Sequence, residues 1–168
     1  MAFFDAYKEV PFQKVYTSTL QRTKQTIQKF LDLGLAHAEL PGLDEICWGE
    51  SEGLFANGQN NKKYRDIINT WKSGNLHARL EGGENPLDVQ KRQEEALNFI
   101  ASQEEDLVLV CMHGRALKIL LAWITGLHMK EMDLFDHDNL SLYILVFEND
   151  KWIIEAHDER GHLNNGTL

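Results

Sequence analysis

Two side chains suited to binding a phosphoryl group follow short apolar segments of the chain. Arg22 comes after the strand-like segment 15–17, and His113 directly follows the apolar run 107–112. An arginine presents a fixed fork of donors to two phosphate oxygens, and a protonated histidine donates a charge-assisted hydrogen bond to phosphate. The sequence therefore predicts that Arg22 and His113 bind one anion together.

Both segments have the pattern of a strand that turns directly into a helix. Apolar residues recur at helical spacing after each of them, namely Leu20, Ile27, Phe30 and Leu31 in one case and Leu117, Leu120, Leu121 and Ile124 in the other. Ligands bind α/β sheets at the carboxyl ends of the strands, so Arg22 and His113 are expected to lie close together. Gly114 would let the backbone approach a ligand closely, and Ser18 is expected to cap the helix that carries Arg22.

Further local signals predict the remaining elements. Asn85 and Pro86, followed by Asp88, indicate a helix start, Gly126 a helix end, and Asn149-Asp150 the turn of a hairpin. The alternation of strands and helices predicts an α/β fold, a three-layer α/β/α sandwich with a mixed sheet. A length of 168 residues with 43% hydrophobic content predicts a single domain, 1–168.

The charge and composition exclude several kinds of partner. A net charge of −9 disfavours nucleic acid and anionic membrane surfaces. No apolar run is long enough to span a bilayer and no signal-peptide pattern begins the sequence, so we expect a cytoplasmic protein. Neither cysteine has metal-ligand spacing, and no metal or cofactor is expected. Five further histidines are expected at the surface or in loops: His37, His77, His128, His137 and His157.

Four motifs in order resemble those of the histidine phosphatase superfamily, also called phosphoglycerate mutase-like. They are Thr17-Ser18-Thr19-Leu20-Gln21-Arg22 with Gln25-Thr26, the segment 43–53, Gly82-Gly83-Glu84 with Asp88-Val89 and Arg92, and Met112-His113-Gly114-Arg115. The resemblance covers nearly the whole chain. It implies a phosphoglycerate mutase-like fold, a small phosphorylated substrate, and hydrolysis of a phosphomonoester through a phosphohistidine intermediate, with no cofactor.

The resemblance also implies roles for individual residues. The family motif Leu-x-Glu-x-x-x-Gly falls on Leu43, Glu45 and Gly49, which makes Glu45 the expected proton donor to the leaving oxygen. Arg22 and His113 complete the expected catalytic set. Glu84 is the second candidate for the acid and, with Gly114 and Ser18, is expected to contact the substrate. Residues 54–81 are expected to form a cap over the site that sets substrate choice.

The sequence departs from the family at one motif. The family's Arg-His-Gly, which carries the phospho-acceptor histidine at the end of the first strand, does not occur in this chain. The segment 2–10 resembles the end of the family's first helix, so we expect roughly 40 residues of the domain to be missing before it. The chain as given is therefore expected to be inactive. The strand 107–112 is expected to pair either with strand 141–147 or with a second chain in a homodimer.

Two alternatives stay open. A phosphoglycerate mutase-type phosphoryl transfer uses the same motifs, although the short spacing between Arg22 and Glu45 resembles the phosphatase branch. A non-catalytic anion-binding or interaction domain would need Arg22 and His113 but no phospho-acceptor. Upstream sequence with an Arg-His-Gly after an apolar strand would favour the enzyme.

Overall fold

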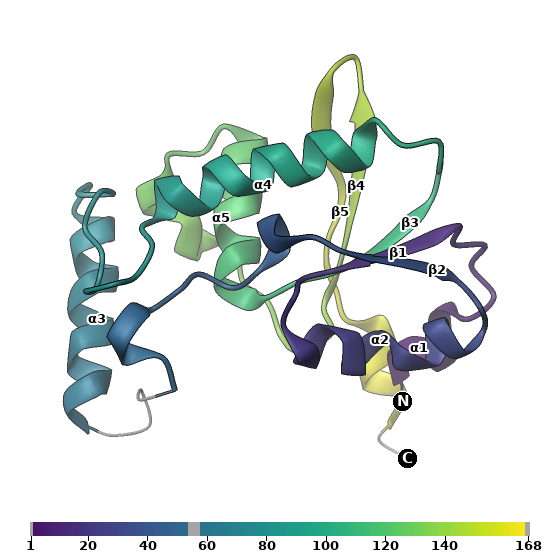
Figure 1. Ribbon diagram of the computed structural model, residues 1–168, viewed down its shortest axis with the longest axis horizontal. Helices are drawn as coiled ribbons and strands as arrows, with labels where there is room; N and C mark the ends of the chain where they lie inside the picture. Colours follow the sequence, from purple (N-terminus) through teal and green to yellow (C-terminus); the bar gives the residue numbers. More distant parts are fainter. Residues whose placement is uncertain (1, 54–57, 167–168) are drawn as a thin grey trace.

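The computed structural model describes residues 2–53 and 58–166. Within these residues, three parallel strands form one sheet in the order β2-β1-β3, and two antiparallel strands form a hairpin (Figure 1). The strands are β1 (Lys14–Thr17), β2 (Ala36–Glu39), β3 (Val108–Cys111), β4 (Leu142–Glu148) and β5 (Lys151–Glu159). Thr17 is in register with Glu39 and with Cys111, so the carboxyl ends of the three parallel strands coincide.

Helices cover both faces of the parallel sheet. The helices are α1 (Ala2–Tyr7), α2 (Gln21–Asp32), α3 (Gly58–Lys72), α4 (Pro86–Ala101) and α5 (Gly114–Thr125). Neighbouring residues of a strand point to opposite faces: Val15 packs with Ile27 and Phe30 of α2, whereas Tyr16 packs with residues of α4 and α5 such as Leu97 and Leu120. The α/β fold with a parallel sheet is thus confirmed, with helices on both of its faces.

The local signals for helix ends and for the hairpin turn are confirmed. Asn85 accepts hydrogen bonds from the backbone of Leu87 and Asp88, and the Asp88 side chain accepts one from the Asn85 backbone, so α4 begins with a capping box. Gly126 ends α5 with a φ of 70°. Both turn residues of the hairpin have positive φ, 51° at Asn149 and 60° at Asp150, which is the conformation of a type I′ turn.

The predicted single mixed sheet is divided into two sheets. Among the described residues β3 pairs with β1 alone, and β4 pairs with β5 alone, so the predicted pairing of strand 107–112 with strand 141–147 is wrong. Side chains of the hairpin pack against the same apolar cluster as Val110 and Met112, a cluster that includes Tyr16, Leu97 and Leu120; they are Tyr143, Leu145, Trp152 and Ile154. The hairpin is therefore joined to the rest of the fold through this shared apolar cluster. Pairing with a second chain stays a prediction.

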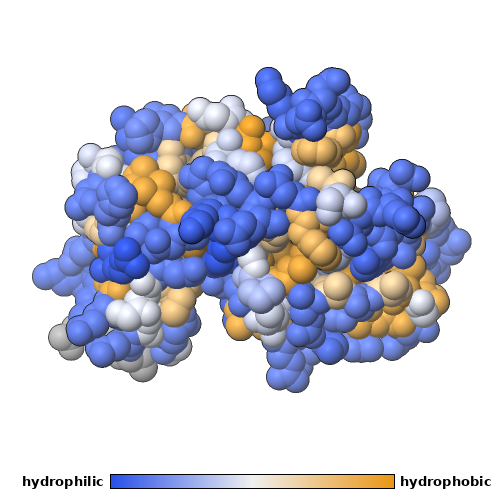
Figure 2. All heavy atoms as spheres, turned by 45° about the horizontal axis from the view of Figure 1, so that its top comes forward, coloured by the Kyte–Doolittle hydropathy of each residue, from blue (hydrophilic) through white to orange (hydrophobic). Residues whose placement is uncertain are grey.

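Helix α3 stands at the end of the molecule opposite the termini (Figure 1). It buries Ile67, Ile68 and Trp71 against Ile119 of α5 and Met132. This helix makes up much of the segment 54–81, of which residues 54–57 lie outside the described part, and its role as a cap stays a prediction. Over the face seen in Figure 2, polar side chains dominate and apolar residues show in separate patches. None of the described helices is long and apolar enough to cross a membrane.

Candidate functional site

Arg22, His113 and Ser18 meet at the carboxyl ends of β1 and β3. His113 is the N-cap residue of α5, and Arg22 lies in the first turn of α2. The Nε of Arg22 donates a hydrogen bond of 3.0 Å to Nδ1 of His113, and Nε2 of His113 lies 2.7 Å from Oγ of Ser18. The structure thus brings together three of the residues that the sequence assigned to an anion site.

The hydrogen bonds determine the protonation state of His113. A guanidinium has donors only, so Nδ1 of His113 must accept from Arg22, and the ring is then neutral with its proton on Nε2, which donates to Ser18. Burial of the ring and the positive charge of Arg22 lower the pKa of His113 to about 4, and Arg92 adds to this effect, although Asp44 opposes it. In this arrangement His113 is neutral, and the hydrogen bond from a protonated His113 to a bound phosphate stays a prediction.

Ser18 positions the histidine ring instead of capping the helix. The N-cap residue of α2 is Leu20, which has no side-chain cap, so the predicted capping role of Ser18 is wrong. Its Oγ accepts from the Leu20 backbone at 3.2 Å and lies 2.9 Å from Oγ1 of Thr23. Ser18 and Thr23 are both buried, so these bonds have little competition from water.

Glu45 lies at the same helix end as His113. Its carboxylate accepts from the backbone of Arg115 at 3.2 Å and of Ala116 at 2.8 Å, the first turn of α5, and from its own neighbour Ile46 at 3.0 Å. The N-terminus of a helix favours a negative charge, and its free amides are suited to a carboxylate. Glu45, Gly114 and His113 are therefore gathered at one point, as the sequence predicted for them.

Glu84 lies apart from the candidate residues that gather around His113. Its two oxygens bind Arg92 at 2.8 and 3.0 Å, and one of them also accepts from the Cys47 backbone at 2.9 Å. The structure therefore brings Glu84 to Arg92 and not to His113, and a contact with substrate stays a prediction. Arg92 also donates to the carbonyl oxygens of Asp44 at 2.9 Å and of Glu45 at 3.2 Å.

Sequence reasoning missed the roles of Arg92 and Asp44. Arg92 holds the loop that carries Glu45. In the sequence, only its place in the third motif could have indicated this role. Asp44 accepts from the Thr19 backbone at 2.7 Å and from the Thr19 hydroxyl at 2.8 and 3.0 Å, so it ties that loop to the turn before α2. In the sequence, the position of Asp44 directly before Glu45 could have indicated this role.

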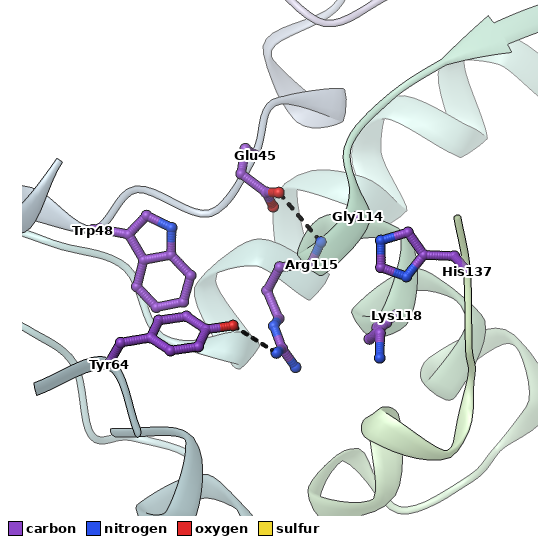
Figure 3. Close-up of a pocket in the computed structure, with 7 residues that line it drawn as sticks. All are labelled: Glu45, Trp48, Tyr64, Gly114, Arg115, Lys118 and His137. Atoms are coloured by element: carbon purple, nitrogen blue, oxygen red, sulfur yellow. Dashed lines mark hydrogen bonds between the residues drawn. The ribbon is translucent and has the colours of Figure 1, made fainter. Parts of the chain in front are cut away.

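A cavity of about 390 Å³ opens beside the His113 cluster. Its lining residues are Glu45, Trp48, Tyr64, Gly114, Arg115, Lys118 and His137 (Figure 3). Trp48 and Tyr64 form one side, with ring centroids 5.2 Å apart, and Lys118 and His137 form the other. His137 lies in the loop before β4, as expected, and its ring packs so closely on Gly114 that a side chain there would overlap it.

Basic residues surround one half-buried carboxylate near this cavity. Arg115 binds Asp133 through Nη1 and the Tyr64 hydroxyl through Nη2, at 2.9 Å. Nζ of Lys72 lies 3.3 Å and Nζ of Lys118 3.6 Å from the Asp133 carboxylate. Burial works against the charge on Asp133, but the attraction and hydrogen bonds of Arg115 and Lys72 together outweigh it and hold the pKa of that carboxyl below its usual value.

Comparison with solved structures shows that this fold occurs in other proteins. The chain is similar to α-ribazole phosphatase from Shigella flexneri, with 21% identity and a TM-score of 0.77 over 95% of this chain and 79% of that one. It is similar to Bacillus stearothermophilus YhfR, with 22% identity and a TM-score of 0.82 over 96% and 81%. A mycobacterial glucosyl-3-phosphoglycerate phosphatase in complex with inorganic phosphate shares 19% identity, with a TM-score of 0.79 over 94% and 82%.

Sequence comparison agrees with these structural similarities at the level of the family. Among curated proteins, none matches the chain by sequence. A family model, that of the histidine phosphatase superfamily (branch 1), matches residues 1–160. It spans all four motifs and both strand ends that carry Arg22 and His113. The chain belongs to the histidine phosphatase superfamily.

Proposed function

We propose that this chain belongs to a phosphatase that hydrolyses small phosphomonoesters through a phosphohistidine intermediate. The observation that carries the proposal is the cluster of Arg22, His113 and Ser18 at the carboxyl ends of two parallel strands, with Glu45 at the same helix end. Membership of the superfamily supports it. So do the similar structures, of which the α-ribazole and glucosyl-3-phosphoglycerate enzymes are named phosphatases.

A phosphoryl group would bind by replacing the hydrogen bond between Arg22 and His113 with hydrogen bonds to its own oxygens. Arg22 turns its guanidinium from Nδ1 of His113 to two phosphate oxygens, which are stronger acceptors because they are charged. Relieved of the Arg22 donor and facing a dianion, His113 takes up a proton and donates to a third oxygen. The dipole of α5 adds to the stabilisation, because its N-terminus begins directly after His113.

Glu45 would supply the proton for the leaving oxygen. Hydrolysis of a phosphomonoester needs an acid for the departing alkoxide and later a base for the attacking water, and one carboxyl can serve in turn. The carboxylate of Glu45 lines the cavity (Figure 3) and accepts hydrogen bonds from the first turn of α5, which begins directly after His113, so it lies near both the phosphoryl cluster and the space for the leaving group.

The phospho-acceptor is the part of the mechanism that we do not assign to this chain. None of its seven histidines stands between an arginine and a glycine. Among the described residues, His137 is the one imidazole that lines the cavity, and its ring is packed on Gly114. We therefore expect phosphate release from an aryl phosphate at the background rate. Clear turnover that is lost in His137→Asn would contradict this and make His137 the acceptor.

Anion binding tests the proposal directly. Orthovanadate or sulfate titrated into the protein in a calorimeter should bind, and Arg22→Ala and His113→Ala should each abolish the heat of binding. Lys24→Ala is the matched control, because it removes a cation from the same helix at a residue paired with Glu39 outside the cluster. Binding that survives both cluster variants would place the phosphoryl site elsewhere.

A non-catalytic anion-binding domain is the second candidate. It is favoured by the way the cluster satisfies its own hydrogen bonds, since Arg22, His113 and Ser18 bind one another. A chain extended upstream by a strand that ends in Arg-His-Gly separates the candidates. Phosphate release supports the phosphatase, transfer to a second alcohol supports a mutase, and anion binding without either supports the binding domain.

A further inference from the structure

We propose that the cavity beside His113 binds a carboxylate carried by a planar, aromatic leaving group, so that the substrate is a phosphomonoester with a second anionic group. This inference rests on the proposed function, because it assigns the phosphoryl group of the same molecule to Arg22 and His113. It names the substrate class by the charge and shape of the cavity (Figure 3).

The first argument is an excess of positive charge. Arg115, Lys72 and Lys118 all lie within 4 Å of the single carboxylate of Asp133. Glu45 also lines the cavity, but its carboxylate is engaged by three backbone amides. The cavity is lined by two cations, Arg115 and Lys118, and one carboxylate, Glu45, while Lys72 and Asp133 lie beside it as an ion pair, so one positive charge is left over in a chain whose net charge is −9. Such a local excess favours an anionic ligand.

The second argument is the geometry of Lys118. Its Nζ is 3.6 Å from the nearest Asp133 oxygen, longer than a normal hydrogen bond, while Arg115 already binds that same oxygen. The Lys118 side chain is only 15% exposed, yet Figure 3 shows its ammonium group directed into the cavity between Arg115 and His137. An ammonium group held out of bulk water, with donors to spare, is well placed to bind a carboxylate.

The third argument is the aromatic wall opposite Lys118. Trp48 is stacked on Trp71 at 5.9 Å between ring centroids, with an angle of 26° between the planes, and it contacts Tyr64 edge-on. Trp71 is buried, so the wall is held rigidly from behind. A cavity with a rigid aromatic side and a few polar groups favours a planar apolar body with an anion at its far end.

Three probes test the substrate class by calorimetry at a fixed salt concentration: inorganic phosphate, phenyl phosphate and 4-carboxyphenyl phosphate. We expect 4-carboxyphenyl phosphate to bind about tenfold more tightly than phenyl phosphate, which is worth about 1.4 kcal/mol. Lys118→Met should bring the ratio of the two affinities close to one. Lys91→Met, an exposed lysine of α4, is the matched control and should keep the ratio.

The outcomes separate this inference from the proposed function. If Arg22→Ala leaves the binding of all three probes intact, the phosphoryl site is wrong. If Arg22→Ala abolishes binding but the carboxylate gives no advantage, or Lys118→Met preserves the advantage, only the second anion site is wrong. A tenfold advantage that is lost in Lys118→Met and kept in Lys91→Met supports both assignments.

Discussion

The His113 cluster and the cavity beside it lie at the same end of α5 but differ in how their polar groups are satisfied. In the cluster, Arg22 donates to His113, and His113 lies within hydrogen-bonding distance of Ser18, so the groups that would hold a phosphate hold one another. In the cavity, Lys118 stands 3.6 Å from a carboxylate that Arg115 already occupies. The polar groups of the cluster are hydrogen-bonded to one another, whereas the cavity has an excess of positive charge.

This difference suggests that the two sites recognise different parts of the substrate. A closed cluster opens only for a ligand that replaces several hydrogen bonds at once, as a phosphoryl dianion does, so it selects for charge and geometry. A cavity with an excess cation and a rigid aromatic side selects for the rest of the molecule. Substitutions in one site, in the other, or in the loop between them therefore test whether the two sites differ in this way.

The largest effect is expected for the arginine that supports both sites. Arg92 binds Glu84 through two hydrogen bonds and donates to the backbone carbonyl groups of Asp44 and Glu45. Asp44 contacts the turn before α2, and Glu45 lines the cavity. Arg92→Ala leaves a largely buried carboxylate and several carbonyl groups unpaired, and should lower the free energy of unfolding by about 3 kcal/mol. Urea denaturation measures this loss.

Arg79 offers the matched control for Arg92. It also pairs with a carboxylate, Asp88, but its side chain is 51% exposed against 19% for Arg92. Arg79→Ala should therefore cost less than about 1 kcal/mol. Equal losses for the two variants would show that Arg92 is an ordinary surface arginine and that the loop does not depend on it.

The next effect is the pH dependence of stability that the closed cluster creates. The pKa of His113 is about 4 in the folded protein and about 6.5 in an unfolded chain, so the unfolded state binds more protons between these values. The contribution is complete above pH 6.5 and is lost as pH falls towards 4. We expect it to amount to about 2 kcal/mol between pH 7 and 5.

Urea denaturation at pH 7, 6 and 5 measures this slope. His113→Gln should remove it, because glutamine does not titrate, whereas His77→Gln, at an exposed histidine, should leave it unchanged. A wild-type slope in the His113→Gln protein would mean that other groups titrate in this range and that the buried ring is not responsible.

A smaller effect is the proton that should accompany anion binding. Sulfate stays dianionic throughout the neutral and mildly acidic range, so any change in its affinity with pH reports the protein. If His113 exchanges Arg22 for a proton when the anion binds, the affinity for sulfate should rise up to about tenfold per pH unit as pH falls from 7 to 5.5. Calorimetry in buffers of different ionisation enthalpy counts the proton directly. No proton uptake would mean that the anion leaves the bond between Arg22 and His113 intact.

The sequence predicted those features that depend on a few neighbouring residues. The helix start at Asn85 and Pro86, the helix end at Gly126 and the hairpin turn at Asn149-Asp150 all depend on local sequence, and each of these predictions is confirmed. The pairing of strand 107–112 with 141–147 was wrong because strand pairing depends on the whole chain. No short pattern shows which edges meet.

The site shows the same limit at the level of side chains. Residue types and strand ends were enough to bring Arg22 next to His113. The neutral state of His113 could not be predicted, since it follows from which of its nitrogens faces Arg22. The engagement of Glu84 by Arg92 and the position of His137 on Gly114 join residues far apart in the sequence. Such contacts are set by packing, which the order of residues alone does not reveal.

The smallest expected effect tests whether the positive charge near the cavity is truly in excess. Lys72 lies 3.3 Å from Asp133, but its side chain is 52% exposed, so Lys72→Met should change the free energy of unfolding by at most about 0.5 kcal/mol. Asp133→Asn should cost several times more, because Arg115, whose side chain is 12% exposed, then lacks its ionic partner. Urea denaturation of both variants measures these two changes in the free energy of unfolding. If Lys72→Met costs as much as Asp133→Asn, every cation is needed to balance the carboxylate, and the cavity has no positive charge left for a ligand.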